Sequence, residues 1–386
     1  MNTYPPLVEP APELTPHQAQ RYARHAILPE LGTLGQRRLL NAKVLVIGAG
    51  GLGSPILLYL AAAGIGHLGI IDDDTVDLSN LQRQIIHTTN NIGTTKVDSA
   101  RTAITDINPT INITTYNQRL TPENALDILT GWDIIVDGTD NFATRYLIAD
   151  ATEILNTPCV WGAILRFDGQ LSTFWPGKGP VYRDLFPDPP NPNSVPSCAQ
   201  AGVLGALCAS IGSAMAMEVI RLITGIGTPL IGRLMIHNAL TGTWNELTIH
   251  PDPNRTPTTT LTTYPTTCTQ PPQPLITEHT ITPTELHTLL DDRANGTIEF
   301  TLIDVREPTE HKLVTIDGAT LIPKNDIITN PTTVPTHQPA ILFCKSGARS
   351  TEALTTLLNT GRDDVWQLQG GILAWIEHIE PHKPRY

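Results

Sequence analysis

The chain has 386 residues, a hydrophobic content of 40% and a formal net charge of −12. This length allows two or three domains, each with its own core. The acidic balance excludes nucleic acid as the main partner, because neutralising phosphates requires a basic face. The five cysteines are odd in number and widely spaced, which excludes a disulfide framework. No C-x-x-C pair occurs, so a four-thiolate zinc knuckle is excluded as well.

The N-terminal residues are polar and proline-rich, with neither the basic start nor the apolar stretch of a signal peptide. We identify no apolar run that approaches the roughly 20 residues needed to cross a bilayer. The sequence therefore predicts a cytoplasmic protein without membrane contact.

The first 250 residues alternate between strand and helix patterns. Residues 1–40 carry apolar side chains at helical spacing, and short apolar runs then alternate with helices, which is typical of a parallel sheet with crossovers. A long helix is predicted near residues 201–225. The runs that indicate strands are KVLVIGAG (43–50), HLGIIDDD (67–74), DIIVDGTD (133–140) and the stretch 159–175.

The composition changes near residue 251, where proline and threonine dominate and no periodicity remains. Such a stretch is typical of an extended linker. A second, smaller strand–helix pattern follows. The prediction is a mostly parallel α/β domain and a smaller α/β domain joined by a tether, with boundaries at 15–250, 251–275 and 276–386.

A glycine-rich motif, GAGGLG (48–53), follows the first strand and opens a helix. Glycines there let backbone amides approach a phosphate at the positive end of the helix. Asp72, at the end of the next strand, is placed to bind a ribose hydroxyl. The motif alone fits NAD enzymes as well as ATP enzymes. Its candidate nucleotide-binding glycines are Gly48, Gly50, Gly51 and Gly53.

Three charged residues favour a triphosphate over a dinucleotide. Arg83, Lys96 and Asp140 are all expected at the same strand ends. Cations there would neutralise the charge that moves towards a leaving pyrophosphate. Asp140 would supply an oxygen ligand to Mg²⁺.

These motifs resemble the ubiquitin-activating (E1-like) superfamily, specifically its molybdopterin-synthase and thiamine-pathway adenylyltransferases. The resemblance covers roughly residues 15–250 and rests on GAGGLG, DDDTVDLSNLQRQ and TDN. It implies an α/β adenylation domain that binds ATP and Mg²⁺. It also implies a homodimer, since an arginine at the position of Arg24 reaches into the partner's site in this family. The implied nucleotide-binding residues are Asp72, Asn80, Arg83, Gln84, Lys96 and Asp140, with Arg83 also catalytic.

The sequence departs from this family where many relatives bind a structural zinc on two C-x-x-C pairs. The first pair is replaced by VYRD, with Val181 and Asp184 at the thiolate positions. The second keeps Cys268 but has Pro271 as its other member. One thiolate cannot hold zinc tetrahedrally, so we expect no structural zinc.

A second motif, CKSGARS (344–350), follows an apolar strand. The amides after Cys344 can curl around its sulfur at a helix N-terminus, and Lys345 and Arg349 add positive charge. These features favour the thiolate and would also stabilise a persulfide. The C-x4-R spacing makes a smaller ring than the C-x5-R of cysteine phosphatases, which remain the alternative. With LIDVRE and LQGGILAW, the segment 276–386 resembles a single rhodanese module.

The remaining cysteines carry less information. Cys198 precedes the long helix, where relatives place a cysteine that bonds covalently to the carrier or to the rhodanese thiol; a core role is equally consistent. Cys159 and Cys208 lie in apolar surroundings and indicate core positions, as do Met215 and Met217. Asp304 and Arg306 are interpreted as a structural ion pair.

Together the motifs predict a bifunctional adenylyltransferase and sulfurtransferase. Its expected partner is a small ubiquitin-like sulfur carrier that ends in Gly-Gly, as the family resemblance implies. The carrier's identity and the sulfur donor, thiosulfate or a cysteine desulfurase, stay open. Two alternatives remain: an NAD-dependent oxidoreductase fused to a rhodanese module, and a non-catalytic carrier-binding scaffold.

Overall fold

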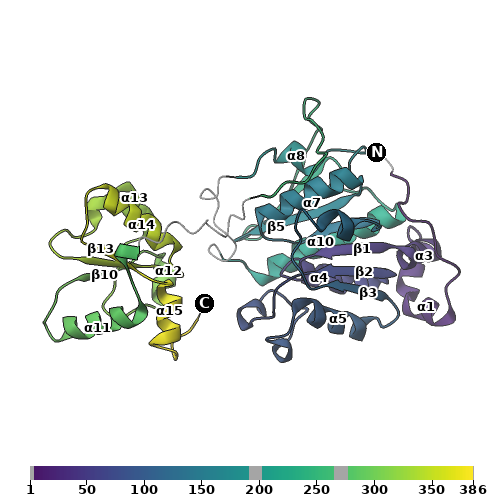
Figure 1. Cartoon of the computed structure of the whole chain (residues 1–386). Helices are drawn as coiled ribbons and strands as arrows, with labels where there is room; N and C mark the ends of the chain where they lie inside the picture. The colour runs from purple at the N-terminus through teal and green to yellow at the C-terminus, as the bar shows by residue number, and fades with distance from the viewer. Residues whose placement is uncertain (1–3, 191–201, 265–276, 386) are drawn as a thin grey trace. The chain divides into compact units, whose positions relative to one another are not determined.

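The computed structural model describes residues 4–190, 202–264 and 277–385. The chain divides into two compact units, Met1–Gln270 and Pro271–Tyr386 (Figure 1). Each unit is built around its own sheet.

The first unit contains an eight-stranded sheet in the order β3-β2-β1-β4-β5-β6-β7-β8. The five neighbouring strands β3, β2, β1, β4 and β5 pair in parallel, whereas β6, β7 and β8 pair antiparallel at one edge. Its strands are β1 (Lys43–Ile47), β2 (His67–Ile71), β3 (Asn112–Tyr116), β4 (Ile134–Asp137), β5 (Cys159–Leu165), β6 (Asp168–Phe174), β7 (Arg233–Asn238) and β8 (Thr243–Thr248).

Helices cover both faces of this sheet. Helices α5 and α7 each begin at a polar N-cap residue. The Thr95 side chain accepts a hydrogen bond from the Asp98 amide at the start of α5, and the Asn141 side chain accepts one from the Thr144 amide at the start of α7. The helices are α1 (Pro16–Arg21), α2 (Ala23–Ala26), α3 (Gly32–Asn41), α4 (Gly53–Ala63), α5 (Lys96–Ile107), α6 (Ala125–Leu129), α7 (Phe142–Leu155), α8 (Tyr182–Leu185) and α10 (Gly205–Thr224), with short 3₁₀ turns η1 (Leu78–Asn80) and η2 (Thr89–Asn91).

The central strand β1 shows how the two faces are built. Val44 and Val46 point into the cluster formed with α3, α4, α5 and α10. Leu45 and Ile47 point into the opposite cluster with α6 and α7. A strand that is apolar on both faces must be covered on both, which is why the run KVLVI shows no polar alternation.

Helix α10 corrects one expectation. It is long and apolar enough, by composition alone, to cross a membrane, although 56% of an 18-residue apolar stretch within it is buried inside the protein. It packs against α3, α4, β5 and β6. Its buried Glu218 accepts hydrogen bonds from the Leu230 amide (2.6 Å) and the Thr173 hydroxyl (3.0 Å). These contacts are those of an internal helix.

The second unit is a five-stranded, all-parallel sheet in the order β11-β10-β12-β13-β9. Helices α11 and α15 cover one face, and α13 and α14 cover the other. Its elements are η3 (Thr277–His279), β9 (Thr280–Ile281), α11 (Pro283–Ala294), β10 (Thr301–Asp304), α12 (Pro308–Leu313), β11 (Thr320–Leu321), α13 (Lys324–Thr329), η4 (Pro331–Thr333), β12 (Ala340–Phe343), α14 (Ala348–Asn359), β13 (Val365–Leu368) and α15 (Gly371–His378).

The proline- and threonine-rich composition of the segment after β8 predicts a linker between the units. The described part of this segment, residues 251–264, instead contacts the first unit. Arg255 forms ion pairs with Glu153 and Asp184, and Tyr264 donates a hydrogen bond to Asp150. Its first half is therefore attached to the first unit by charged and aromatic side chains, which a reading of proline and threonine content does not reveal.

Candidate active sites

A cavity of about 580 Å³ opens at the carboxyl ends of β1, β2 and β4. This volume suits a nucleotide-sized ligand, and strand ends of a parallel sheet are where such ligands bind. The structure brings most of the predicted nucleotide residues to this cavity. Those that line it are Gly48, Gly50, Gly51, Asp72, Arg83, Gln84, Lys96 and Asp140.

Two glycines of the motif are required by close backbone approaches. Gly48 has a φ of +94°, and a Cβ there would lie 3.1 Å from the Gly138 carbonyl oxygen. A Cβ on Gly53 would lie 1.9 Å from the Gly48 carbonyl oxygen, which is impossible. Gly53 thus shapes the loop from the first turn of α4, and it is not among the residues that line the cavity.

Asp72 is already bonded to the glycine loop. Its carboxylate accepts hydrogen bonds from the Ala49 amide (2.8 Å) and from the Asp74 amide (2.9 Å). Burial raises the pKa of Asp72, while the Lys96 ammonium and the hydrogen bonds from the two backbone amides oppose that shift. The carboxylate therefore holds the loop and faces the cavity at the same time.

Four cationic side chains line the same cavity: the predicted Arg83 and Lys96, and also Arg119 and Arg145. Lys96 is only 6% exposed, and its Nζ lies 2.7 Å from Asp74 Oδ2. Arg83 Nη1 donates to the Ser79 carbonyl oxygen at 3.1 Å. Arg83 and Lys96 can place positive charge beside a polyphosphate, in a cavity that Asp72, Asp74 and Asp140 also line.

His87 also belongs to this site, and no sequence motif pointed to it. Its Nε2 lies 2.9 Å from the Ala49 carbonyl oxygen, which can only accept, so Nε2 carries the proton. Its Nδ1 then accepts from the Ser99 hydroxyl at 2.8 Å. Burial lowers the pKa of His87, which favours this neutral form. Together with Asp72, His87 fixes both polar groups of the Ala49 backbone.

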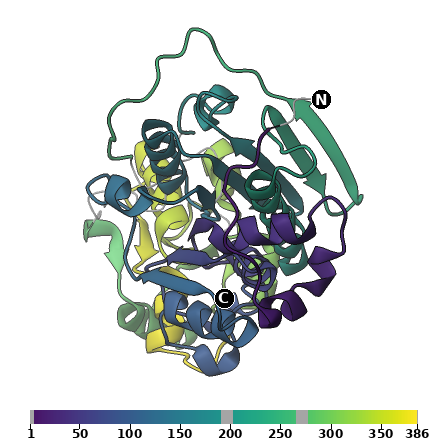
Figure 2. The same cartoon turned by 90° about the vertical axis from the view of Figure 1, so that its right-hand side faces the viewer.

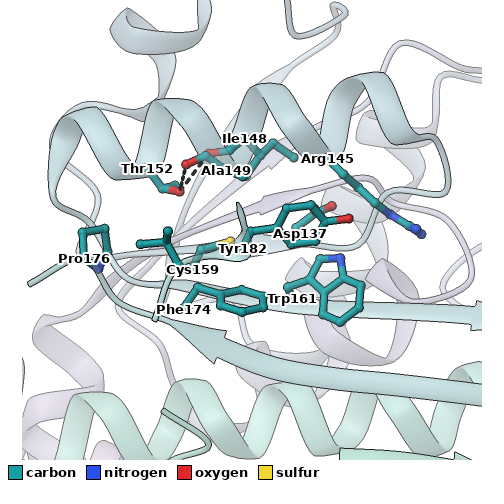
Figure 3. Close-up of a pocket in the computed structure, with 11 residues that line it drawn as sticks. Asp137, Arg145, Ile148, Ala149, Thr152, Cys159, Trp161, Phe174, Pro176 and Tyr182 are labelled. Atoms are coloured by element: carbon teal, nitrogen blue, oxygen red, sulfur yellow. Dashed lines mark hydrogen bonds between the residues drawn. The ribbon is translucent and has the colours of Figure 1, made fainter. Parts of the chain in front are cut away.

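Asp140 is exposed at the cavity edge, and buried groups behind it hold its loop. Asp137 Oδ1 accepts from the Thr139 amide (3.0 Å) and hydroxyl (2.7 Å). Arg145 Nη2 donates to the Thr139 carbonyl oxygen at 2.8 Å. Asp137 and Arg145 also line a small cavity of about 10 Å³ together with Trp161, as Figure 3 shows. Thr139 is thus held on all of its polar groups.

Besides Gly53, three predicted residues of the first unit are not among the described residues that line the cavity: Asn80, Arg24, whose predicted role is in the partner's site, and Cys198. Asn80 Oδ1 accepts from the Asp77 amide at 3.0 Å as part of a capping box, and Asn80 does not line the cavity. Arg24 is exposed on α2 and does not line it either. Cys198 lies outside the described residues.

The sulfur loop, residues 344–350, closes around a buried thiol. Cys344 directly follows β12, which ends at Phe343, and is 1% exposed. The Gly347 amide donates to its Sγ at 3.2 Å, and the Ser350 hydroxyl oxygen lies 3.5 Å from the sulfur. Gly347 reaches this position with a φ of +109°, immediately before α14 begins at Ala348. One backbone donor and a helix N-terminus therefore surround the sulfur.

Arg349 does not act as an isolated cation. Its guanidinium forms two hydrogen bonds with the Glu310 carboxylate, at 2.6 and 2.8 Å. Burial lowers the pKa of Lys345, the other cation of the loop, and Glu310 opposes the shift. The positive potential expected from CKSGARS is therefore partly compensated by a carboxylate from α12, which no local motif announces.

The expected Asp304–Arg306 ion pair is confirmed. Both side chains are buried, and Arg306 Nη2 lies 2.5 Å from Asp304 Oδ2. His311 Nδ1 lies 2.9 Å from the same carboxylate oxygen. The pair supports β10 from within the core, where Arg306 Nη2 also donates to the Val314 carbonyl oxygen at 2.7 Å.

The core assignments are right for three residues and wrong for one. Cys159, Cys208 and Met215 are buried, and burial raises the pKa of the Cys159 thiol well above its usual value. Met217 is 44% exposed because it lies on the outer face of α10. At the position of the first C-x-x-C pair, Val181 is buried and Asp184 binds Arg255; Cys268 lies outside the described residues.

Comparison with known proteins identifies a family for each of the two units. Residues 22–258 match the ThiF family. The chain belongs to the ThiF family. Residues 282–378 match the rhodanese-like domain, so the predicted pair of α/β domains is confirmed.

Relatives of this ThiF member span its whole length. It is 49% identical over 391 residues to the probable adenylyltransferase/sulfurtransferase MoeZ of Mycobacterium tuberculosis (strain ATCC 25618 / H37Rv), with 99% of both chains covered. It is 47% identical to a sulfur carrier protein adenylyltransferase of Thermus thermophilus, over 62% of this chain and 90% of that one. The solved structure of E. coli MccB with AMPCPP and MccA shares the fold, with a TM-score of 0.56 and 19% identity over 62% of this chain and 74% of that one.

Proposed function

We propose that this protein adenylates the C-terminal glycine of a small ubiquitin-like sulfur carrier with ATP and then converts it to a thiocarboxylate. The observation that carries the proposal is the presence, in one ThiF-family chain, of a nucleotide-sized cavity lined by cations and carboxylates and of a rhodanese-type cysteine loop. The full-length similarity to an adenylyltransferase/sulfurtransferase supports the pairing of these two activities.

In the first step, the carrier carboxylate attacks the α-phosphorus of ATP. The bond from that phosphorus to the bridging oxygen of pyrophosphate breaks, and an acyl-adenylate forms. Asp72 would bind the ribose, while Arg83 and Lys96 would neutralise charge on the departing pyrophosphate. The glycine loop, fixed by Asp72 and His87, leaves room for the phosphates. Gln84 lines the same wall, and Asn80 would join the phosphate contacts after leaving its cap.

The residues at the cavity edge fit Mg²⁺. Asp140 is exposed there, and the carboxylates of Asp72, Asp73 and Asp74 lie within 4.8 Å of one another. Carboxylate oxygens are the ligands that this hard cation prefers. Bound Mg²⁺ would supply positive charge to the phosphates. Asp140 is held ready for this role by the buried Thr139 contacts.

In the second step, the terminal sulfur of a Cys344 persulfide attacks the acyl carbonyl carbon and AMP leaves. The product is an acyl disulfide that joins the carrier to Cys344. A second thiolate then attacks Sγ of Cys344, which releases the carrier thiocarboxylate and leaves a protein disulfide for a reducing thiol. Cys198 is the proposed second thiol; the Gly347 amide, which donates to Sγ at 3.2 Å, and Arg349 of the same loop would hold the sulfur in place.

The proposal includes a homodimer in which Arg24 reaches the partner's site, a cytoplasmic location, and no nucleic acid or membrane partner. The sulfur donor is thiosulfate or a cysteine desulfurase. No structural zinc is proposed, since Asp184 and Val181 offer no thiolate and Asp184 is already paired with Arg255.

The decisive experiment mixes the full chain, ATP, Mg²⁺ and thiosulfate with candidate Gly-Gly-ended carriers and weighs each carrier by mass spectrometry. The expected result is a mass gain equal to replacement of one oxygen by one sulfur. No gain with any such carrier contradicts the proposal. Carrier-dependent pyrophosphate exchange into ATP separates it from an oxidoreductase, and thiocyanate formation from thiosulfate and cyanide separates it from a non-catalytic scaffold.

A further inference from the structure

After β8, the chain runs along the first unit up to Tyr264. In Figure 2 it is the long green arc that leaves the edge strands and descends on the other side. Within it, the half-buried residues recur at every third position: Arg255, Thr258, Leu261 and Tyr264. Every third residue of an extended, threonine- and proline-rich chain lies on one side of it. This segment thus presents one regular side to the unit.

Buried charge holds that side in place. Asp150 of α7 is 1% exposed and binds Arg183 of α8 at 2.6 and 3.2 Å. The Tyr264 hydroxyl donates to the same carboxylate and accepts from Arg183 Nη2 at 2.5 Å. The Arg183 guanidinium also lies against the rings of Tyr146 (5.0 Å) and Tyr264 (5.6 Å). Thr258 adds a fourth hydrogen bond to Asp150, at 3.3 Å.

A second anchor lies nine residues earlier. Arg255 donates to both Glu153 carboxylate oxygens, at 2.6 and 3.1 Å, and to Asp184 at 3.0 Å. Both carboxylates are largely buried, so these ion pairs resist screening better than surface pairs do. Asp150 and Glu153 come from one helix, and Arg183 and Asp184 from another. The segment is therefore fixed to two helices by two adjacent charge clusters.

The anchored end of the segment reaches the nucleotide cavity. Thr262, Thr263 and Tyr264 line it, although they lie beyond residue 258, where the ThiF match ends. Leu261 and Tyr264 pack against the apolar cluster that contains Leu120 and Leu147. Both leucines line the cavity too.

The geometry points to a role in nucleotide recognition for the interdomain chain. We propose that residues 261–264, held by Asp150 and Arg255, form the wall that covers the base of the bound nucleotide. An apolar wall with threonine hydroxyls suits a purine, which offers a flat face and polar edges. This inference rests on the proposed function, because it takes ATP as the ligand. Asp150 and Arg255 are positioning residues that act through the segment.

Direct ATP binding to the full chain tests this role. Asp150→Asn and Arg255→Gln are each expected to weaken ATP binding, measured by calorimetry, about five- to tenfold, because the wall must then be ordered on binding. The kcat of pyrophosphate exchange should change little while the KM for ATP rises. Arg233→Gln is the matched control: it breaks a more exposed pair with Glu246 on β7 and β8 and should leave both values unchanged.

Limited proteolysis within residues 258–264 supplies a second readout. In both anchor variants, cleavage there should accelerate, because the segment loses an attachment. In the wild type, saturating ATP should slow cleavage there, since ATP binding and the ordered wall stabilise each other. This response to ATP is the one that a merely structural role would not produce, and cleavage within β8 should not show it.

Two results overturn the inference. One is faster cleavage at 258–264 in the variants with unchanged ATP affinity; the other is no acceleration in either variant. Both leave the proposed function standing. If the wild type binds no ATP, the proposed function falls together with the inference. Two variants on different helices guard against a single misfolded one.

Discussion

The sulfur loop and the nucleotide cavity are built on opposite plans. The sulfur loop is one stretch of seven residues that closes around a thiol, and the groups within hydrogen-bonding distance of Sγ come from that same stretch. The cavity is lined by segments that range from residue 47 to residue 264. The first excludes solvent from its reacting atom, whereas the second is wide and holds cations at its wall.

This difference teaches where each site is vulnerable. A site made from one stretch depends on a few backbone contacts and on one atom that nothing can replace. A site made from many segments depends on how several elements meet, so single changes should be graded rather than absolute. The following predictions test that contrast, beginning with the largest effect.

Cys344→Ala should abolish sulfur transfer, by at least about a thousandfold, because the nucleophile is removed. Carrier-dependent pyrophosphate exchange should persist, since the cavity lies in the other unit. Thiocyanate formation and carrier mass report the two activities. Cys159→Ala, a buried cysteine of the first unit, is the control and should keep sulfur transfer. Residual transfer by Cys344→Ala would contradict the assignment.

Lys96→Met should slow pyrophosphate exchange about 10²- to 10³-fold, the usual effect of losing one charge-stabilising group. The substitution keeps the length of the side chain and leaves Asp74 in solvent, where its side chain is already 64% exposed. Asp74→Asn removes the ion pair but keeps the ammonium, so it should cost far less. Equal losses in the two variants would show that the pair, rather than the cation, matters.

Gly53→Ala and Gly371→Ala should each disable one site selectively. A Cβ at Gly53 would meet the Gly48 carbonyl oxygen at 1.9 Å, and at Gly371 the Cys344 carbonyl oxygen at 2.4 Å. Each loop must shift, at a cost of about 1–3 kcal/mol in stability by thermal unfolding. Gly53→Ala should lose exchange and Gly371→Ala sulfur transfer.

Gly296→Ala is the matched control for these two glycines. Like Gly371, whose φ is +61°, Gly296 has a positive φ, +74°, but a Cβ there meets nothing within 4 Å. It should show only backbone strain of about 1–2 kcal/mol. If it impairs either activity as strongly as the two loop substitutions, the clash argument is wrong.

Asp137→Asn should show the smallest effect, and one that depends on pH. Burial raises the pKa of Asp137, and Arg145 and Thr139 oppose the shift. Because the folded pKa exceeds the unfolded one, the contribution of this carboxyl to stability is fully present below the unfolded pKa and is lost as pH rises through the folded pKa. Each unit of difference is worth about 1.4 kcal/mol.

Asparagine cannot ionise but can still accept from Thr139. The melting temperature of Asp137→Asn should therefore gain on that of the wild type as pH rises from 4.5 to 8. Calorimetry at several pH values measures this difference. A difference that stays constant with pH would mean that the carboxyl does not titrate as described.

The sequence predicted those parts of the molecule that depend on residues close to one another along the chain. GAGGLG and CKSGARS predicted two loops because strand, glycine and helix follow each other within a few residues. The apolar runs predicted a sheet covered on both faces. Asp72 and Lys96 were found because their spacing from the loop matches a known family.

Contacts between distant segments escaped prediction. The Glu310–Arg349 pair, the His87–Ala49 bond and the attachment of Arg255 each join residues separated by 38 or more positions. Met217 was misplaced because an apolar residue in an apolar helix gives no sign of which side faces outward. Composition likewise suggested a free tether where the Asp150 cluster fixes the chain.

The depth of the Cys344 sulfur has a consequence for fidelity. With 1% of the residue exposed, Sγ lies below the surface of the loop. A second sulfur adds one S–S bond, about 2 Å, and carries the reactive atom outward. Under the proposed chemistry, an activated carrier meets the outer sulfur first, which favours attack by the persulfide over attack by the bare thiolate. The recessed position of Sγ thus disfavours a dead-end thioester that would bring no sulfur to the carrier.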